Sequence, residues 1–122
     1  MSDITKKATS SNFQAEVLDF KGVVLVDFYA DWCMPCKVLS PEIEMLAEEM
    51  QDNPLVKIAK LDTEKNMDIA QKYEITSIPN IIIFKDGQKI KQLIGVPRGN
   101  GGEAPRAVYK QLILEILAEN NI

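Results

Sequence analysis

The segment that most constrains the fold is residues 23–30, which read Val-Val-Leu-Val-Asp-Phe-Tyr-Ala. Apolar side chains occupy both sets of alternating positions, and Asp27 interrupts them. A strand that is apolar on both faces is typical of the interior of a sheet that has helices on each side. The segment therefore predicts a central strand that is buried on both faces.

The chain before and after this strand shows helical spacing of apolar residues. Ser11 and Gln14 have the spacing of a capping box, which predicts a short helix that ends before Gly22. After the strand, apolar residues three and four positions apart predict a longer helix that begins at Cys33, with a kink near Pro41. The apolar stripe of that helix consists of Leu39, Ile43, Leu46, Ala47 and Met50.

The second half of the chain predicts three further strands and two helices. Residues 55–61 have the pattern of a strand, and Asp86-Gly87 between residues 81–84 and 89–94 is the signature of a two-residue β-hairpin. Helical spacing predicts a short helix before Ile78-Pro79 and a last helix that runs to the C-terminus. The apolar residues of these helices are Met67, Ala70 and Tyr73, and then Val108, Leu112, Ile113, Ile116 and Leu117.

The order of these elements predicts an α/β fold, because strands alternate with helices before the chain closes on a hairpin, which favours a mixed sheet. The length of 122 residues, with 46% hydrophobic and 26% charged residues, fits one ordinary globular domain over residues 1–122. Residues 95–105 hold four of the six glycines. They predict a flexible, Gly/Pro-rich surface loop inserted before the last helix.

Charge and composition exclude several classes of function. With 14 Lys and Arg against 18 Asp and Glu, the net charge of −4 gives no basic surface for nucleic acid or an anionic membrane. The absence of histidine excludes Ser-His catalysis, Cys-His catalysis and His-ligated zinc. The chain has neither a secretory signal at its start nor the ~18 consecutive apolar residues of a membrane span. We therefore expect a soluble, cytoplasmic protein.

The two cysteines, Cys33 and Cys36, lie where the central strand ends and the long helix begins. Unpaired N–H groups and the positive end of the helix dipole favour a thiolate at Cys33, which predicts a nucleophile. One helical turn later, Cys36 can reach the same sulfur and resolve a mixed disulfide. Pro35 fits the first helical turn, where a missing N–H costs little. The alternatives are half of a metal site completed by a second chain, or two inert core thiols.

Asp27 is the second candidate for chemistry. An ionised carboxylate isolated in an apolar strand is costly, so burial should raise the pKa of Asp27 toward the range useful for proton transfer. Lys60 is an available partner, since residues 55–61 can pair alongside the central strand. The alternative is a structural buried ion pair between the two residues.

Several separate motifs resemble the thioredoxin family. Residues 24–37, Val-Leu-Val-Asp-Phe-Tyr-Ala-Asp-Trp-Cys-Met-Pro-Cys-Lys, are similar to its active-site segment. The similarity continues through residues 57–62, Ser77-Ile78-Pro79 and Phe84-Lys85-Asp86-Gly87, in the family's order. It implies a mixed sheet of four to five strands flanked by helices, which ends in a β-hairpin and a C-terminal helix.

The resemblance also implies an activity. Members of the family exchange dithiols for disulfides on client proteins and are reduced by a thioredoxin reductase. Their redox group is the disulfide itself, here Cys33–Cys36, so neither a bound cofactor nor a metal is expected, and a monomer is the family expectation. The resemblance assigns Asp27 and Lys60 to a buried acid and its nearby lysine, which assist proton removal from Cys36.

Ile78-Pro79 is assigned differently by its sequence and by the resemblance. An X-Pro bond is cis in only ~5–6% of cases in folded proteins, so the dipeptide alone predicts a trans bond or a turn. The resemblance implies a cis proline that faces the dithiol, where the Ile78 backbone pairs with the substrate chain. The other substrate-binding candidates are Trp32, whose alternative is the core, and Met34, Pro35, Gly95 and Val96.

The chain departs from the family pattern at a few positions. Met34 replaces the usual glycine between the cysteines and leaves the redox potential open, although the motif lacks the histidine of strongly oxidising relatives. Tyr29 and Asn80 replace residues common in the family, and residues 97–105 are longer than its usual link. We expect a disulfide reductase. The alternatives are an isomerase or oxidant with a shifted potential, a non-catalytic binding module, or a dimer that holds metal between two Cys33–Cys36 pairs.

Overall fold

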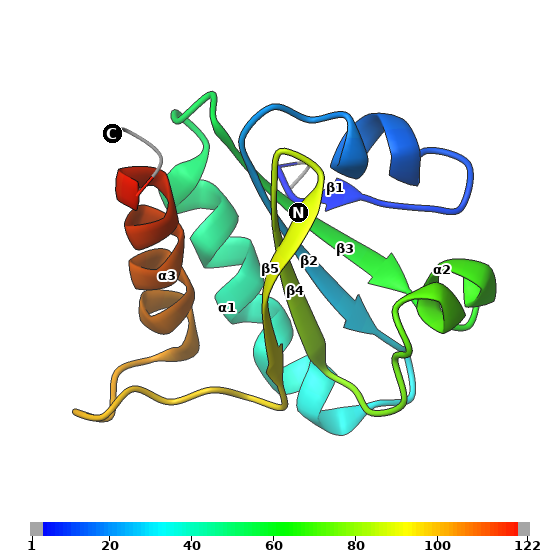
Figure 1. Cartoon of the computed structure of the whole chain (residues 1–122). Coiled ribbons are helices and arrows are strands. Elements are labelled where there is room, and N and C mark those ends of the chain that lie inside the picture. The colour runs from blue at the N-terminus through cyan, green and yellow to red at the C-terminus, as the bar shows by residue number, and fades with distance from the viewer. Residues whose placement is uncertain (1–3, 120–122) are drawn as a thin grey trace.

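The computed structural model describes residues 4–119 and arranges them as a five-stranded sheet between helices (Figure 1). The strand order is β1-β3-β2-β4-β5. The strands are β1 (Lys6–Lys7), β2 (Val23–Tyr29), β3 (Val56–Asp62), β4 (Asn80–Lys85) and β5 (Gln88–Ile94). The helices are the π-helix η1 (Gln14–Leu18) and the α-helices α1 (Met34–Met50), α2 (Met67–Lys72) and α3 (Pro105–Glu119).

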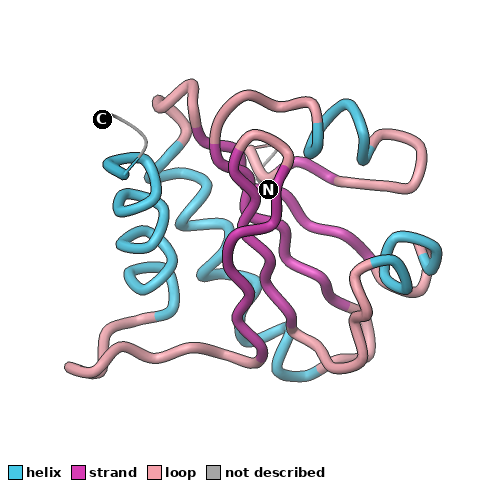
Figure 2. Tube along the Cα trace, viewed as in Figure 1, coloured by secondary structure: helices cyan, strands magenta, loops and turns pink. Residues whose placement is uncertain are grey.

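Strand β2 is central, as its two apolar faces predict. It runs parallel to β3 and antiparallel to β4, which makes the sheet mixed. Helices α1 and α3 cover one face, and η1 and α2 lie on the other side (Figures 1 and 2). Val23 and Leu25 enter the core under α1 and α3, while Val24, Val26 and Phe28 enter the opposite core. The predicted α/β class is confirmed.

The β4–β5 hairpin turns at Asp86-Gly87, as predicted. Both residues have positive φ, +50° and +84°, which is the conformation of a tight two-residue hairpin turn. A Cβ at Gly87 would lie 2.4 Å from the Leu18 carbonyl oxygen, so glycine is required there for space as well as for backbone conformation. This turn fixes the pairing of the two strands that follow residues 78–79.

The start of the chain differs from the prediction. The capping box at Ser11 and Gln14 is wrong: η1 begins after Phe13, no side chain caps it, and Gln14 Nε2 instead donates to Asp19 Oδ1 over 2.8 Å. The segment is held by burial of Phe13, which is 2% exposed. Strand β1 was not predicted, because two residues are too short to show a periodic pattern.

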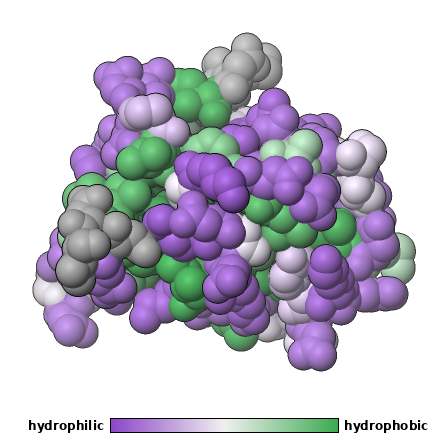
Figure 3. Space-filling view, turned by 45° about the horizontal axis from the view of Figure 1, so that its top comes forward, coloured by the Kyte–Doolittle hydropathy of each residue, from purple (hydrophilic) through white to green (hydrophobic). Residues whose placement is uncertain are grey.

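Helix α1 begins directly after Cys33 and continues through Pro41 to Met50. The remaining expected elements are present, with boundaries that differ by one to a few residues. Helix α3 is described to Glu119, and the predicted continuation to the C-terminus lies outside the described residues. Residues 95–104 form an irregular loop, at the end of the molecule where α1 begins (Figure 1). No helix within residues 4–119 is both long and apolar enough to cross a bilayer. Hydrophilic side chains cover most of the face in Figure 3, with smaller hydrophobic areas between them.

Candidate functional site

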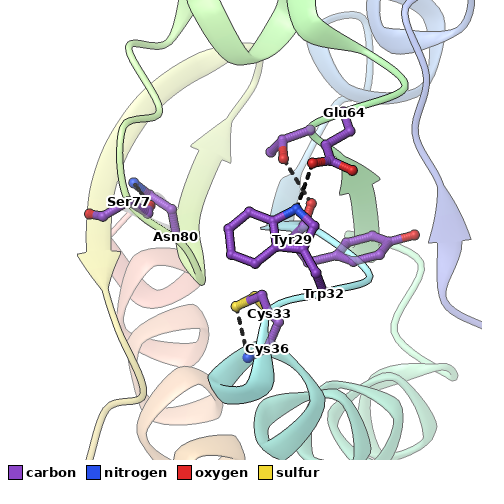
Figure 4. Close-up of a disulfide and its surroundings, with 8 residues drawn as sticks. Tyr29, Trp32, Cys33, Cys36, Glu64, Ser77 and Asn80 are labelled. Carbon is purple, nitrogen blue, oxygen red and sulfur yellow. Dashed lines mark hydrogen bonds between the residues drawn. A yellow bond between two sulfur atoms is a disulfide. The ribbon is translucent and has the colours of Figure 1, made fainter.

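The two cysteines form a disulfide at the first turn of α1 (Figure 4). Cys33 is the N-cap residue, with an extended backbone at φ −85° and ψ 109°. Its Sγ accepts a hydrogen bond from the Cys36 backbone N–H over 3.2 Å. Pro35 lies in the first turn, where the helix needs no N–H from it. The predicted position of the pair between strand and helix is therefore confirmed.

The disulfide is nearly buried, while its neighbours in the chain are exposed. Cys33 and Cys36 are 3% and 5% exposed, and Ile78 packs against them from another segment. Trp32 and Met34 are 65% and 66% exposed. Two large apolar side chains therefore remain in solvent beside the disulfide. The alternative of Trp32 as a core residue does not hold.

Trp32 is held by a residue that the sequence did not single out. Its indole Nε1 donates a hydrogen bond to Glu64 Oε2 over 2.5 Å (Figure 4). Glu64 follows β3, and β2 and β3 are parallel, so the loops after the two strands meet at one edge of the sheet. The signal that could have identified Glu64 is its place just after a strand predicted beside residues 23–30. Its acidic side chain by itself indicates nothing more than a solvated loop.

The segment on the other side of the disulfide contains the Ile78–Pro79 bond, which is cis, as the resemblance implies. Gly95 N donates a hydrogen bond to the Pro79 carbonyl oxygen over 2.8 Å, which joins the end of β5 to this segment. Gly95 has a φ of +85°, and Val96 after it is 41% exposed. Figure 4 shows Ser77 and Asn80 on the same segment, which faces the disulfide. The structure thus brings these candidates to the end of the sheet that carries the cysteines.

Asp27 lies behind the disulfide, on β2. It is 5% exposed, and burial raises the pKa of its carboxyl to about 7, although the Lys60 ammonium opposes this change. Asp27 and Lys60 are paired in register on neighbouring parallel strands. Both line a cavity of about 250 Å³ together with Cys36. The other residues around this cavity are Tyr29, Ala30, Asp31, Lys37 and Ser40.

The direct ion pair between Asp27 and Lys60 is not formed. Lys60 Nζ lies 4.0 Å from Glu44 Oε2, and Glu44 is the carboxylate with which it pairs within residues 4–119. Asp27 Oδ1 has no hydrogen-bond partner in the same part of the chain. The sequence did not indicate Glu44, because a glutamate at a partly exposed helix position is also typical of a solvated face. The site therefore contains a lysine that is paired with Glu44 and is the strand neighbour of Asp27.

The described residues offer little to a metal. Residues 4–119 contain no cluster of three or more His, Cys, Asp or Glu side chains that could hold a metal ion. The chemistry available within this site is that of the Cys33–Cys36 disulfide and a nearby buried acid.

Comparison with known proteins agrees with this site. The Thioredoxin family model matches residues 4–101. A thioredoxin of Chlorobaculum thiosulfatiphilum is 46% identical over 89 residues, which covers 73% of this chain and 81% of that protein. Thioredoxin C-2 of Corynebacterium nephridii is 45% identical over 95 residues, which covers 78% of this chain and 86% of its own.

A longer relative places such a domain beside a reductase. The bifunctional thioredoxin reductase/thioredoxin of Mycobacterium leprae is 42% identical over 92 residues, 75% of this chain and 20% of that protein. The family match spans most of this chain, and the alignments with the two thioredoxins cover 73% and 78% of it, so the similarity extends far beyond the cysteine motif. The chain belongs to the thioredoxin family and is a protein thiol-disulfide oxidoreductase.

Proposed function

We propose that this oxidoreductase reduces disulfides in cytoplasmic client proteins, with Cys33 as the nucleophile and Cys36 as the resolving thiol. The observation that supports this assignment most is the place of Cys33 at the N-cap of α1. There the Cys36 N–H points at Cys33 Sγ, and the helix dipole favours negative charge on that sulfur. Cys36 is already inside the helix, so its sulfur lacks the same support.

The reaction takes place in two exchanges. The Cys33 thiolate attacks one sulfur of a client disulfide, forms a mixed disulfide and releases the other client sulfur as a thiolate. Cys36 then loses its proton, and its thiolate attacks Cys33 Sγ. This forms the Cys33–Cys36 disulfide and releases the second client thiolate. Two electrons pass from the dithiol to the client, and no bound cofactor takes part.

Asp27 is the proposed acceptor of the Cys36 proton. Its carboxyl and Cys36 line the same cavity, which is large enough to hold water between them. A pKa of about 7 means that the carboxyl can both take up and release a proton near neutral pH. Lys60, next to Asp27 on β3, is the proposed residue that moderates this pKa.

The proposed client surface surrounds the disulfide. Trp32, Met34 and Val96 offer exposed apolar side chains, and Pro35 lies between the cysteines. The backbone of Ile78 and the cis Pro79 would pair with an extended client segment, while Gly95 holds Pro79 in place. Main-chain pairing with shallow apolar contacts suits an enzyme that accepts many client sequences.

The proposed source of electrons is a separate thioredoxin reductase. The fusion of the two activities in the Mycobacterium leprae relative supports this pairing. We further propose that residues 1–122 form one domain, since Tyr109 and Ile113 of α3 belong to the same core as residues of α1 and β2. We also propose that the chain acts as a monomer.

Trapping experiments test the assignment of the cysteines. Cys36→Ser should accumulate a stable mixed disulfide with a client through Cys33, because no thiol remains to resolve it. The matched variant Cys33→Ser should accumulate little. Stronger trapping by Cys33→Ser would reverse the two roles, and no trapping by either variant would refute disulfide exchange with that client.

A further inference from the structure

Two carboxyl groups on different elements lie near one lysine beside the dithiol. Asp27 lies on β2, Glu44 on α1 and Lys60 on β3. We propose that Glu44 is a positioning residue of the exchange site, which holds the Lys60 ammonium and so limits its support of a negative charge on Asp27. This inference rests on the proposed role of Asp27 as proton acceptor.

The first observation is the register of the strands. Asp27 and Lys60 are Cα partners on adjacent parallel strands, so their side chains leave the same face of the sheet. That face is covered by α1, which packs on β3 (Figure 1). Lys60 would be the natural counter-ion of Asp27, and an ammonium beside a carboxyl favours the ionised form.

The second observation is that Lys60 forms its ion pair with Glu44 and not with Asp27. Lys60 Nζ pairs with Glu44 Oε2 at 4.0 Å, and Asp27 Oδ1 has no hydrogen bond within residues 4–119. The other oxygen of Glu44, Oε1, is buried and also has no partner there. Two incompletely satisfied carboxyl groups therefore compete for one ammonium, and the structure shows Lys60 on the side of Glu44.

The competition has a defined electrostatic consequence. When Glu44 holds the Lys60 ammonium, that ammonium is kept at a greater distance from Asp27, and its field at the Asp27 carboxyl is weaker. Burial then dominates, which agrees with the raised pKa of Asp27 and with the smaller, opposing effect of Lys60. Without the Glu44 charge, Lys60 is free to stabilise the Asp27 carboxylate, and the pKa of Asp27 should fall.

Other groups face Asp27 and must be kept constant. Tyr29 on the same strand and Tyr109 on α3 remain neutral near pH 7, because burial raises the pKa of both phenols. Strand β4 contributes Ile81, which is apolar. The remaining charged groups around the cavity are Asp31, before α1, and Lys37, on α1. None of these side chains is altered in the variants below.

The direct test is an NMR titration of the Asp27 carboxyl carbon in the oxidised protein. Glu44→Gln keeps the shape of the side chain and should lower the pKa of Asp27 by about half a unit to one unit. Glu44→Asp shortens the side chain and draws the carboxylate away from Lys60. It should therefore also lower the pKa of Asp27, but by less than Glu44→Gln does. The matched control is Glu48→Gln, an exposed glutamate one turn later on α1, which should leave Asp27 unchanged.

A double-mutant cycle tests whether the effect passes through the lysine. Lys60→Met should raise the pKa of Asp27, and Glu44→Gln added to Lys60→Met should change it little. An unchanged Asp27 titration in Glu44→Gln overturns the proposal. So does an equal effect of Glu44→Gln with and without Lys60, since that result would indicate a direct field rather than competition for the ammonium.

A kinetic measurement separates this inference from the proposed function. If Asp27 accepts the proton, Glu44→Gln should speed resolution of the mixed disulfide about threefold at pH 6, because more Asp27 is ionised, and change it little at pH 8. A shifted Asp27 titration without a kinetic change would refute the proposed role of Asp27 and leave the coupling to Glu44 intact. No shift in either measurement would refute the coupling itself.

Discussion

The backbone N–H of Cys36 donates a hydrogen bond to Cys33 Sγ, across one turn of α1. The same N–H is available to a thiolate on Cys33 when the disulfide is reduced, whereas Cys36 has no such place at the helix start. This asymmetry between the two cysteines is the basis for the proposal that Cys33 attacks the client disulfide and Cys36 resolves the mixed disulfide.

The asymmetry predicts unequal reactivity. In the reduced protein at pH 7, iodoacetamide should alkylate Cys33 at least about tenfold faster than Cys36, because only Cys33 is supported as a thiolate. Mass spectrometry of quenched samples measures the two rates. Faster alkylation of Cys36 would contradict this prediction and identify Cys36 as the nucleophile.

Asp27 predicts a pH-dependent cost to stability. Its pKa is about 7 in the folded protein against an ordinary 3.8, so between these values the folded chain binds more protons than the unfolded chain. Stability therefore falls as pH rises through this window. The isosteric variant Asp27→Asn should be more stable than the parent by roughly 2–4 kcal/mol at pH 8, with the gain shrinking toward pH 4.

Urea unfolding of the oxidised protein at several pH values measures this effect. Asp62→Asn is a useful control, because Asp62 is also buried but accepts hydrogen bonds from the backbone N–H groups of Glu64 and Lys65. That variant should be destabilised, since it loses a satisfied carboxylate. A gain for Asp27→Asn that is equal at pH 4 and pH 8 would contradict the raised pKa.

Glu64 is predicted to orient Trp32 on the client surface. Glu64→Ala removes the acceptor of the indole N–H, so the exposed ring should lose its fixed position beside the disulfide. We expect KM for a protein disulfide to rise by about threefold with kcat nearly unchanged, since the reacting sulfurs are untouched. Lys65→Ala, in the same loop, serves as the control. An unchanged KM would show that the orientation of Trp32 does not contribute to binding.

Gly87 is predicted to be the least replaceable residue of the hairpin. Gly87→Ala must place a Cβ 2.4 Å from the Leu18 carbonyl oxygen at positive φ, and it should cost about 2 kcal/mol or more of folding stability. Gly102→Ala has a similar φ of +80° but open space around the Cβ position. It should cost about 1 kcal/mol, so chemical denaturation of the two variants separates the clash from the backbone strain.

The elements predicted best were those whose residues are repeated in a regular pattern. Apolar residues on both faces of residues 23–30 identified β2 and its central place, because burial on both faces is visible in the sequence pattern. Asp86-Gly87 identified the hairpin turn, because local backbone preference decides a two-residue turn. The capping box at Ser11 failed because burial of Phe13 outweighed a local cap. Strand β1 was missed because its two residues depend on pairing with β3.

The residues of the candidate site also differ in how far the sequence predicts them. Cys33, Cys36 and their place at a helix start follow from adjacent residues, and Asp27 stands out as a charge in an apolar strand. Glu44 and Glu64 could not be identified, because their roles arise from contacts with Lys60 and Trp32 across elements. In the sequence, each of these glutamates resembles an ordinary solvated surface residue. Only the tertiary contacts distinguish Glu44 and Glu64 from the other glutamates.

The central claim, that this thioredoxin-family protein acts as a reductant despite Met34, is tested most directly by the equilibrium reduction potential of Cys33–Cys36. The oxidised and reduced forms are titrated against a dithiothreitol or glutathione couple, followed by Trp32 fluorescence, with thiol trapping as a check. We predict a potential near the thioredoxin value of about −270 mV. A value at or above about −200 mV would contradict the account and indicate isomerase or oxidant chemistry instead.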